Sequence, residues 1–252
     1  QRLVAQFVAE GRLLEALDHP NIAQIQDLGM FEGTYFLAME YVEGRDLRDL
    51  QRALPLEDGL QRLDEVSVLG VIADIAEALA HAADRPGSDG RPLRIVHHDV
   101  TPSNIMVRRD GHVKLVDFGV ARSALWQRLE AGSLRGKLPY LCPEQAALTE
   151  ADGRADIFSL GVVLWELVTG KRLYADRSDA LVMERIAHEV PRPPSWENTA
   201  VNASLDLIVL RTLEKQPEDR FDTMDEMAGA LTWWLDKYTD AQPVGELSSW
   251  LE

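Results

Sequence analysis

Hydrophobic residues recur every three or four positions at the start of the chain, a spacing that is typical of one face of a helix. The residues that share this face are Leu3, Phe7, Glu10, Leu14 and Leu17. The helix is expected to end near the Asp18-His19-Pro20 break. Glu10 is the one acid in this apolar stripe. Because an unpaired buried carboxylate is costly, we expect Glu10 to have a cationic partner; a solvent-exposed Glu10 is the alternative.

A strand and two more helices are predicted in the first half of the chain. The apolar stretch 35–42, after a polar turn at Glu32-Gly33, predicts a mostly buried strand. Residues 46–54 have the pattern of a short helix, and residues 66–81 that of a long one. The inward positions of the long helix are Leu69, Ile72, Ala76 and Leu79. The Pro- and Gly-rich residues 84–92 predict a surface loop.

The second half combines one hairpin with several helices. Two short apolar runs, 105–107 and 113–116, flank Asp110-Gly111, which is a strong signal for a tight turn. Residues 157–168 are apolar on nearly all sides and predict a helix at the centre of a helical layer. Further helices are predicted at 179–188, 204–214 and 224–238, the last after the capping pair Thr223 and Glu226. A small part with strands is therefore expected before a larger helical part.

Composition and charge limit the classes of partner that the chain is expected to bind. The 252 residues are 46% hydrophobic, which suits one large domain or two lobes that share a core. Lys plus Arg number 26 against 42 Asp plus Glu, and the net charge of −16 disfavours non-specific binding to nucleic acid or to an anionic membrane. No uninterrupted apolar run is long enough to span a membrane, since even residues 157–168 include Glu166. We expect no nucleic-acid partner and no membrane segment.

The single cysteine and the first residue add two expectations. One cysteine, Cys142, allows neither an internal disulfide nor a multi-cysteine metal site, so a reducing, cytoplasmic location is expected. Cys142 itself is interpreted as a small core residue. The chain begins at Gln1, with helical periodicity almost at once and no signal segment before it. This beginning predicts a fragment of a longer protein.

The predicted hairpin brings an acid, a carboxamide and a second acid close together. Asp99 and Asn104 lie five residues apart before the first strand, and Asp117 follows the second. Mg²⁺ prefers oxygen ligands from one or two carboxylates plus substrate phosphates, and Asn104 with Asp117 supplies such a partial set. Asp99 is then free to orient a hydroxyl and accept its proton. Each residue alone is typical of a turn, but the three together favour a nucleotide and Mg²⁺ site.

These residues stand in motifs that resemble the protein kinase family, in particular the bacterial serine/threonine kinases of eukaryotic (Hanks) type. The catalytic loop H-R-D-x-x-x-x-N of that family is matched at His97, Asp99 and Asn104, and D-F-G is matched at residues 117–119. The A-P-E motif appears as Cys142-Pro143-Glu144. The resemblance extends over nearly the whole chain. It implies an α+β, bilobal kinase fold with an incomplete N-lobe at residues 1–42, a mainly helical C-lobe at 43–238 and a C-terminal extension at 239–252.

The resemblance also implies a reaction: ATP-dependent transfer of a phosphoryl group, with Mg²⁺, to Ser or Thr hydroxyls of a protein substrate. Asp99 would orient the acceptor hydroxyl, and Asn104 and Asp117 would hold Mg²⁺ on the phosphates. Glu10 would pair with a strand lysine that grips the α- and β-phosphates. That lysine and the Gly-rich loop would lie N-terminal to Gln1, so the fragment alone is expected to be inactive.

The remaining nucleotide contacts are assigned by the same resemblance. The hinge segment is residues 39–44, which read Met-Glu-Tyr-Val-Glu-Gly. Backbone groups of Glu40 and Val42 would bind adenine, with Met39 limiting the pocket behind it. Asp46 would meet the ribose hydroxyls, and Met106 would also contact the cofactor.

Other matched residues are assigned to the scaffold of the fold. Glu144 and Arg220 would form a buried ion pair, whose separation would leave an uncompensated charge. Asp156 would hold the catalytic loop, residues 97–104, through hydrogen bonds to its backbone. His97 is interpreted as a core histidine that packs near Phe118.

Two departures from the family pattern concern the catalytic loop. His98 stands where the family has an arginine that binds a phosphorylated activation loop, so control by phosphorylation of Ser123 or Ser133 is left open, although a protonated histidine could pair weakly with a phosphate. In addition, Thr101 and Lys137 stand where the family has a lysine and a threonine. We hypothesise that Lys137 reaches the site from the opposite side and replaces the missing catalytic-loop lysine. The alternative is that the site has lost its lysine.

Three rival functions remain. A pseudokinase or scaffold would have no chemical need for Asp99, Asn104 and Asp117 together. A small-molecule phosphotransferase of the antibiotic-kinase type would lack the segment from D-F-G to A-P-E and the helices after it. A tyrosine kinase would carry an arginine between Asp99 and Asn104, and none is present. The substrate protein, the activating signal and the oligomeric state do not follow from the sequence.

Overall fold

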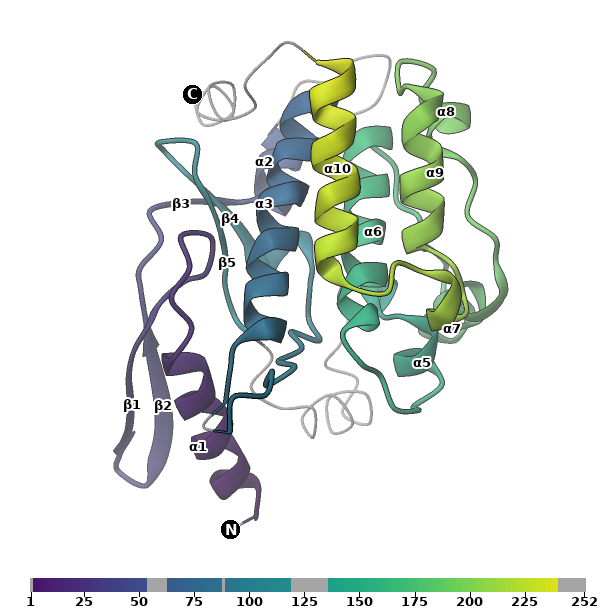
Figure 1. Cartoon of the computed structure of the whole chain (residues 1–252). Helices are drawn as coiled ribbons and strands as arrows, with labels where there is room; N and C mark the ends of the chain where they lie inside the picture. Colours follow the sequence, from purple (N-terminus) through teal and green to yellow (C-terminus); the bar gives the residue numbers. More distant parts are fainter. Residues whose placement is uncertain (1, 54–62, 88, 119–135, 240–252) are drawn as a thin grey trace.

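The computed structural model describes residues 2–53, 63–87, 89–118 and 136–239, and for residues 2–7 and 10 it describes the backbone only. Within these ranges, a small part with one helix and two strands precedes a larger, mainly helical part (Figure 1). The predicted α+β class and the predicted order of its parts are therefore confirmed.

The helices in chain order are α1 (Arg2–Glu15), α2 (Leu47–Ala53), α3 (Glu65–Asp84), α5 (Pro143–Ala146), α6 (Arg154–Thr169), α7 (Asp179–His188), α8 (Pro194–Glu197), α9 (Ala203–Thr212) and α10 (Met224–Tyr238). The strands are β1 (Ile25–Phe31), β2 (Thr34–Met39), β3 (Gly44–Asp46), β4 (Ile105–Arg108) and β5 (Val113–Leu115). The 3-10 turns are η1 (Pro102–Asn104), η2 (Leu138–Tyr140) and η3 (Pro217–Asp219).

The small part consists of α1 and the antiparallel pair β1–β2. The turn between the strands uses Glu32 and Gly33, both at positive φ (48° and 79°), a conformation that tight hairpin turns require. The strand expected at 35–42 exists, but its predicted burial is wrong: Tyr35 and Phe36 are 37% and 42% exposed. Its partner β1 was not predicted. Helix α1 packs against β1 of this pair, and every residue of β2 keeps part of its surface exposed, so the burial expected from the apolar run alone is not reached.

The second sheet connects the two parts of the molecule. Strands β4 and β5 form the predicted hairpin, with Gly111 at φ 85° in its turn. The short strand β3, which was not predicted, pairs with β4 so that Asp46 lies opposite Met106. The segment before β1 runs along β5, where Ile22 bridges to Leu115. The hairpin therefore contacts both the small part and the helical part.

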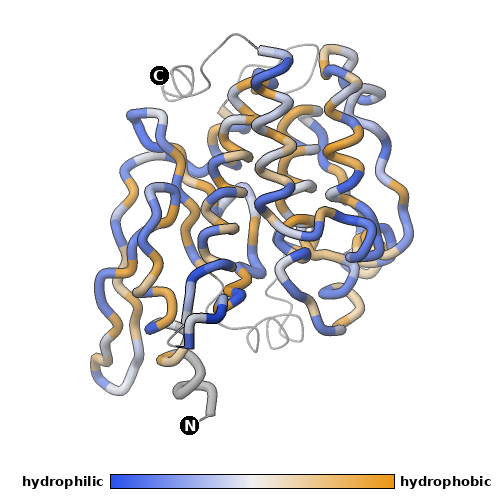
Figure 2. The backbone as a smooth tube through the Cα atoms, in the orientation of Figure 1, coloured by the Kyte–Doolittle hydropathy of each residue, from blue (hydrophilic) through white to orange (hydrophobic). Residues whose placement is uncertain are grey.

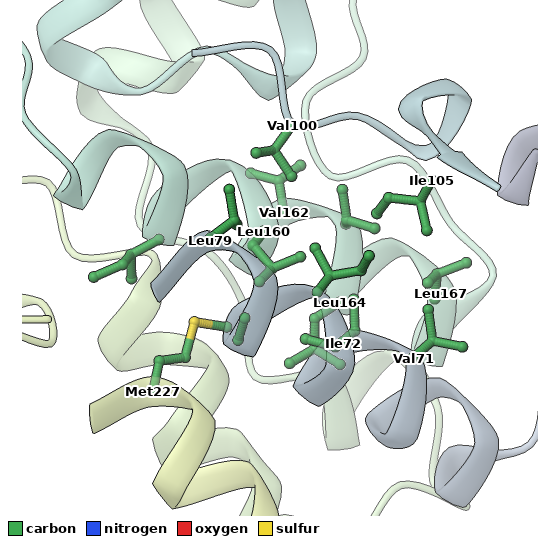
Figure 3. Packing of buried hydrophobic residues seen from close by; sticks show 14 of the residues in the cluster. Val71, Ile72, Leu79, Val100, Ile105, Leu160, Val162, Leu164, Leu167 and Met227 are labelled. Atoms are coloured by element: carbon green, nitrogen blue, oxygen red, sulfur yellow. The ribbon is translucent and has the colours of Figure 1, made fainter. Parts of the chain in front are cut away.

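The core lies between α3, α6 and α10 (Figures 1 and 3). Residues 155–169 of α6 are all buried, which confirms the prediction from the mostly apolar residues 157–168, and Gly170 ends the helix at φ 69°. The predicted inward residues of α3 are buried as well. Helix α3 is long and apolar enough to cross a membrane, but 67% of its most apolar window is buried in this core, which explains its hydropathy (Figure 2).

The C-terminal helices agree closely with the sequence pattern. Helices α7 and α10 have the predicted bounds, and α9 ends two residues earlier than predicted. Thr223 caps α10 by accepting a hydrogen bond from the Glu226 N–H at 3.2 Å. The short helices α5 and α8 were not predicted, because four residues carry no readable period.

Candidate active site

Asp156, at the start of α6, fixes the backbone of the catalytic loop. Its two carboxylate oxygens accept hydrogen bonds from the N–H groups of His97 (2.6 Å) and His98 (2.8 Å), as predicted. His98 has a φ of 62°, a conformation that costs energy in a non-glycine residue unless its surroundings hold it. Burial raises the pKa of Asp156 to about 7, although the two N–H donors act in the opposite direction. The loop thus depends on one buried acid that lies 58 residues after His98 in the chain.

His97 holds the catalytic loop against the end of β5. Its Nδ1 accepts from the Asp99 N–H at 3.2 Å, so Nε2 carries the proton and donates to the Val116 carbonyl, also at 3.2 Å. The ring lies 4.6 Å from that of Phe118, which confirms the predicted contact. Burial lowers the pKa of His97 to about 4, so the imidazole is neutral at physiological pH.

Asn104 and Asp99 are in direct contact. The Asn104 side-chain nitrogen donates to the Asp99 carbonyl at 2.8 Å and to the Asp99 carboxylate at 3.1 Å. Both amide hydrogens are thereby used, which leaves the Asn104 side-chain oxygen as an acceptor for another group. The Asn104 carbonyl also accepts from the Val116 N–H at 2.9 Å. This last bond places Asn104 next to the residue that precedes Asp117.

Asp117 follows β5 in the left-handed backbone region, with a φ of 57°. Its carboxylate makes no hydrogen bond or ion pair with the described residues. The Asn104 oxygen and the Asp117 carboxylate are thus both available as hard oxygen ligands, a donor set that fits Mg²⁺. Among the described residues, no group of three or more His, Cys, Asp or Glu is arranged for a metal. A metal held here would need phosphate and water oxygens to complete its shell.

Lys137 contacts Asp99 from the far side of the loop. Its ammonium forms an ion pair with the same Asp99 oxygen that accepts from Asn104. The residue before it, Gly136, has a φ of 92° and its carbonyl accepts a hydrogen bond from Arg48 at 3.1 Å. The Thr101 hydroxyl is buried and finds no hydrogen-bond partner in the described ranges. The structure thus brings the Lys137 cation to Asp99 and shows no hydrogen bond from the Thr101 hydroxyl to that residue.

Several residues predicted for the nucleotide lie around the β3–β4–β5 sheet. Met106 lies between Asp46 on β3 and Lys114 on β5. One Asp46 oxygen accepts from the Asp49 N–H at 2.9 Å and so caps α2, which leaves the other oxygen for a ligand. The Glu10 backbone lies in α1, and its side chain is outside the described residues.

The rest of the predicted nucleotide contacts belong to the hinge segment. Met39 ends β2, opposite Ile25. The Glu40 N–H donates to the Gln24 carbonyl at 2.8 Å, so its own carbonyl is the group left to bind a ligand. The Val42 side chain is buried. Sequence analysis missed the ion pair between Glu40 and Lys114, since nothing local connects residues 74 positions apart.

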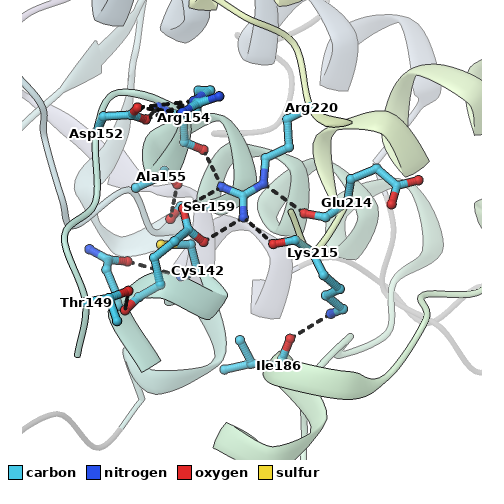
Figure 4. Close-up of polar contacts among 12 residues, drawn as sticks. Cys142, Thr149, Asp152, Arg154, Ala155, Ser159, Ile186, Glu214, Lys215 and Arg220 are labelled. Carbon is cyan, nitrogen blue, oxygen red and sulfur yellow. Dashed lines mark hydrogen bonds and ion pairs between the residues drawn. The ribbon is translucent and has the colours of Figure 1, made fainter. Parts of the chain in front are cut away.

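The Arg220–Glu144 pair confirms the predicted structural ion pair (Figure 4). Arg220 donates to both Glu144 oxygens, at 2.9 and 2.6 Å, and also to the carbonyls of Arg154, Glu214 and Lys215. Cys142 is fully buried, and burial raises the pKa of its thiol, in agreement with a core role. Ser123, Ser133 and Gly119 lie outside the described residues.

A cavity of about 430 Å³ lies between α3, α6 and α10, and Asp156 is part of its lining. Its lining includes Leu79, Ala83, Ile157 and Met224, and none of the residues predicted for catalysis, nucleotide or metal. The site described above is thus defined by contacts among side chains of the catalytic loop and its neighbours.

The fold and this site define a protein kinase, and the chain belongs to the protein kinase family, whose domain model matches residues 1–230. It is 36% identical over 246 residues to tyrosine-protein kinase MasK of Myxococcus xanthus, covering 96% of this chain and 38% of that protein. It is 33% identical to serine/threonine-protein kinase PknB of Mycobacterium leprae and to serine/threonine-protein kinase PrkC of Bacillus subtilis, covering 90% and 89% of this chain and 35% and 33% of those proteins. The chain therefore spans about a third of the length of these relatives.

A solved structure agrees with the fold. The PknI kinase domain of Mycobacterium tuberculosis is 28% identical, with a TM-score of 0.68, and the match covers 92% of this chain and 79% of that one. The predicted resemblance to bacterial Hanks-type kinases is confirmed.

Proposed function

We propose that this chain is part of an ATP-dependent protein serine/threonine kinase that acts in cytoplasmic signalling. The observation that carries the proposal is the contact between Asp99 and Asn104 beside the end of β5, where Asp117 follows. Membership of the kinase family supports ATP as the phosphoryl donor and a protein as its acceptor. The cytoplasmic location rests on the single cysteine, Cys142.

In this proposal Asp99 would accept a hydrogen bond from the acceptor hydroxyl and take up its proton, while the hydroxyl oxygen bonds to the γ-phosphorus, the bond from that phosphorus to the bridging oxygen breaks and ADP leaves. Asn104 holds the Asp99 carboxylate in place with one face of its amide and presents its oxygen to Mg²⁺ with the other. Asp117 provides the second protein ligand. Bound Mg²⁺ neutralises charge on the phosphates. Because this chemistry depends on positioning and charge, the buried hydrogen bonds that Asp156 accepts from the N–H groups of His97 and His98 help to hold the site in shape.

Lys137 is the cation of the site in this proposal. Its ammonium orients the Asp99 carboxylate and steadies the negative charge of the transferred group. The ion pair with Asp99 supports this role, and so does Thr101, which carries no charge at the position where the family has a lysine. Thr101, which stands where the family has the lysine, is proposed to have a packing role.

The adenine would lie against the hinge segment. We propose that it bonds to the Glu40 carbonyl and the Val42 N–H, with Met39 limiting the pocket behind it. Met106 would also contact the nucleotide, and the free Asp46 oxygen would meet the ribose. The proposed partner of Glu10 is a lysine that grips the α- and β-phosphates.

Ser/Thr specificity is supported by two of the three named relatives and by the absence of arginine between Asp99 and Asn104. The third relative bears the name of a tyrosine kinase, so specificity needs a direct test. The full-length protein, incubated with labelled ATP and a mixed protein substrate, is expected to yield phosphoserine and phosphothreonine after acid hydrolysis. Phosphotyrosine alone would contradict the assignment.

A scaffold that uses the kinase fold for protein interaction is the second candidate. The two functions differ in metal-dependent nucleotide binding. Calorimetric titration of the full-length protein is expected to show ATP binding that strengthens with Mg²⁺ and weakens in Asp117→Asn, while Asp99→Asn keeps binding and loses turnover. Absent or metal-independent ATP binding would favour the scaffold.

A further inference from the structure

A half-buried ion pair joins the hinge segment to strand β5. The Lys114 ammonium lies 2.8 Å from the Glu40 carboxylate, and the two side chains are only 11% and 26% exposed. Lys114 belongs to β5, three residues before Asp117, while Glu40 follows the last residue of β2. The contact therefore connects the segment expected to bind adenine with the strand that ends in a metal-ligand candidate.

Both charged groups also bind the segment between α1 and β1. Lys114 donates a second hydrogen bond to the Ile22 carbonyl at 3.2 Å. The Glu40 carboxylate accepts from the Gln24 N–H at 3.2 Å, and the Glu40 N–H donates to the Gln24 carbonyl at 2.8 Å. Residues 22–24 are thus held between the hinge segment and β5.

Backbone hydrogen bonds attach the same segment to β5. The Ala23 N–H donates to the Leu115 carbonyl at 2.9 Å, and the Leu115 N–H donates to the Asn21 carbonyl at 2.8 Å. These bonds hold residues 21–23 on β5 without any help from Lys114. The hinge segment, in contrast, is tied to β5 directly by the Lys114–Glu40 pair. Loss of that pair would remove the direct link between the hinge segment and β5 and would leave only the indirect link through the Glu40–Gln24 hydrogen bonds.

The charge on Glu40 depends on this environment. Partial burial acts to raise its pKa, but the hydrogen bonds from Lys114 and from the Gln24 N–H outweigh burial and lower it. The carboxylate is therefore ionised at neutral pH. Without the Lys114 ammonium, a carboxylate next to the hinge would lose its ion-pair partner, and it would have to move toward water to recover solvation.

We propose that Lys114 is a positioning residue for the nucleotide: through Glu40 it fixes the distance between the adenine-binding hinge and Asp117. This inference rests on the proposed kinase function. The lysine touches neither substrate nor metal in this role. Its effect is to hold two parts of the site at the spacing that one ATP molecule must bridge.

The test is steady-state kinetics of Lys114→Met in the full-length protein. The KM for ATP is expected to rise about tenfold, the effect of one lost charge-assisted hydrogen bond, while kcat stays within about threefold. Lys114→Arg keeps the charge and should recover most of the ATP affinity. A purely structural role would lower thermal stability and the active fraction without raising KM.

A matched control is available in the helical part. Lys171 forms an ion pair of similar geometry with Glu197, at 2.6 Å and away from the hinge segment. Lys171→Met makes the same chemical change and is expected to leave the KM for ATP unaltered. Should Lys114→Met fold poorly, Glu40→Gln keeps the side-chain volume, removes the charge, and is expected to raise the KM in the same direction.

The outcomes separate this inference from the proposed function. If the wild-type protein binds ATP with Mg²⁺ and Lys114→Met and Glu40→Gln bind it equally well, the positioning role is overturned and the kinase function stands. If the wild-type protein binds no ATP, both are overturned. A rise in KM confined to the Lys114 and Glu40 variants, with recovery in Lys114→Arg, supports the inference.

Discussion

The Arg220 guanidinium meets the Glu144 carboxylate through two parallel hydrogen bonds of 2.9 and 2.6 Å, with the arginine side chain fully buried. Glu144 lies in α5, and Arg220 follows η3 just before α10. The pair therefore joins the segment after residue 135 to the C-terminal helices. Three backbone carbonyls satisfy the remaining guanidinium donors, so the buried charge is compensated.

Removal of the Arg220 charge should destabilise the fold strongly. Arg220→Met leaves Glu144 with an uncompensated charge and three carbonyls without donors, which is expected to cost about 3–5 kcal/mol in the free energy of unfolding. Urea denaturation measures this cost. Arg108→Gln breaks an exposed pair with Asp110 and serves as the control, with an expected change below about 1 kcal/mol. Equal effects in the two variants would contradict the prediction.

Asp156→Asn should affect turnover more than nucleotide binding. Asparagine keeps one acceptor but turns its NH₂ toward a backbone N–H. One buried donor of the catalytic loop is then unsatisfied, which costs about 1–3 kcal/mol in the free energy of unfolding. Displacement of Asp99 by such a change is expected to lower kcat about 100-fold. Kinetics with ATP-binding calorimetry separates the two effects. Normal kcat would show that the loop keeps its shape without the carboxylate.

His97 should make the protein sensitive to acid. Its pKa in the folded chain, about 4, lies below its ordinary value of 6.5, so the folded state binds fewer protons than the unfolded state. The stability from the neutral imidazole is present above pH 6.5 and is lost as the pH falls toward 4. Between pH 7 and pH 5 the loss is expected to be about 2 kcal/mol. Urea denaturation at both pH values should show a smaller loss in His97→Gln; an identical loss would assign the acid sensitivity to other groups.

Two glycines should respond in opposite ways to alanine. At Gly161 in α6, a Cβ would lie 2.0 Å from the Thr212 hydroxyl and 2.7 Å from its Cβ, so α9 would have to move. Gly161→Ala is expected to destabilise the protein by about 1–3 kcal/mol. At Gly229, on the exposed side of α10, a Cβ meets nothing within 4 Å, and alanine is expected to stabilise by about 0.5–1 kcal/mol. Thermal or urea denaturation of both variants tests the pair.

The proposed role of Lys137 predicts a specific rescue. Lys137→Ala removes the cation beside Asp99 and is expected to lower kcat about 100- to 1,000-fold with ATP binding retained. Thr101→Lys in that background should recover part of the loss, because it restores an ammonium near the same carboxylate. Lys137→Arg is the charge-preserving control. The variants are compared at equal active fraction in the full-length protein. Near-normal turnover of Lys137→Ala would contradict the hypothesis that Lys137 replaces the missing catalytic-loop lysine.

Long periodic segments could be predicted because their pattern depends only on which side faces the core. Helices α6, α7 and α10 and the β4–β5 hairpin belong to this group. Short elements such as β3, α5 and α8 were missed, since three or four residues carry no period, and their backbone is shaped by neighbours far away in the chain. The burial of β2 was predicted incorrectly, because burial depends on what covers a strand and not only on its own residues.

The motif spacing predicted the Glu144–Arg220 pair, which the structure contains, and it proposed Asp99, Asn104 and Asp117 as site residues. It could not show that the Thr101 hydroxyl finds no hydrogen-bond partner among the described residues or that Lys114 binds Glu40, since each outcome depends on distances between segments.

The order of motifs and hydrophobic periods along the chain, which are local properties, thus determined the family, the fold class and the residue types of the site. Only the tertiary structure decided how the carboxylate oxygens of the site are paired with their hydrogen-bond donors. Hydrogen bonds and ion pairs act over about 3 Å, and the positions of groups 38 or 74 residues apart are fixed only when the whole core is packed.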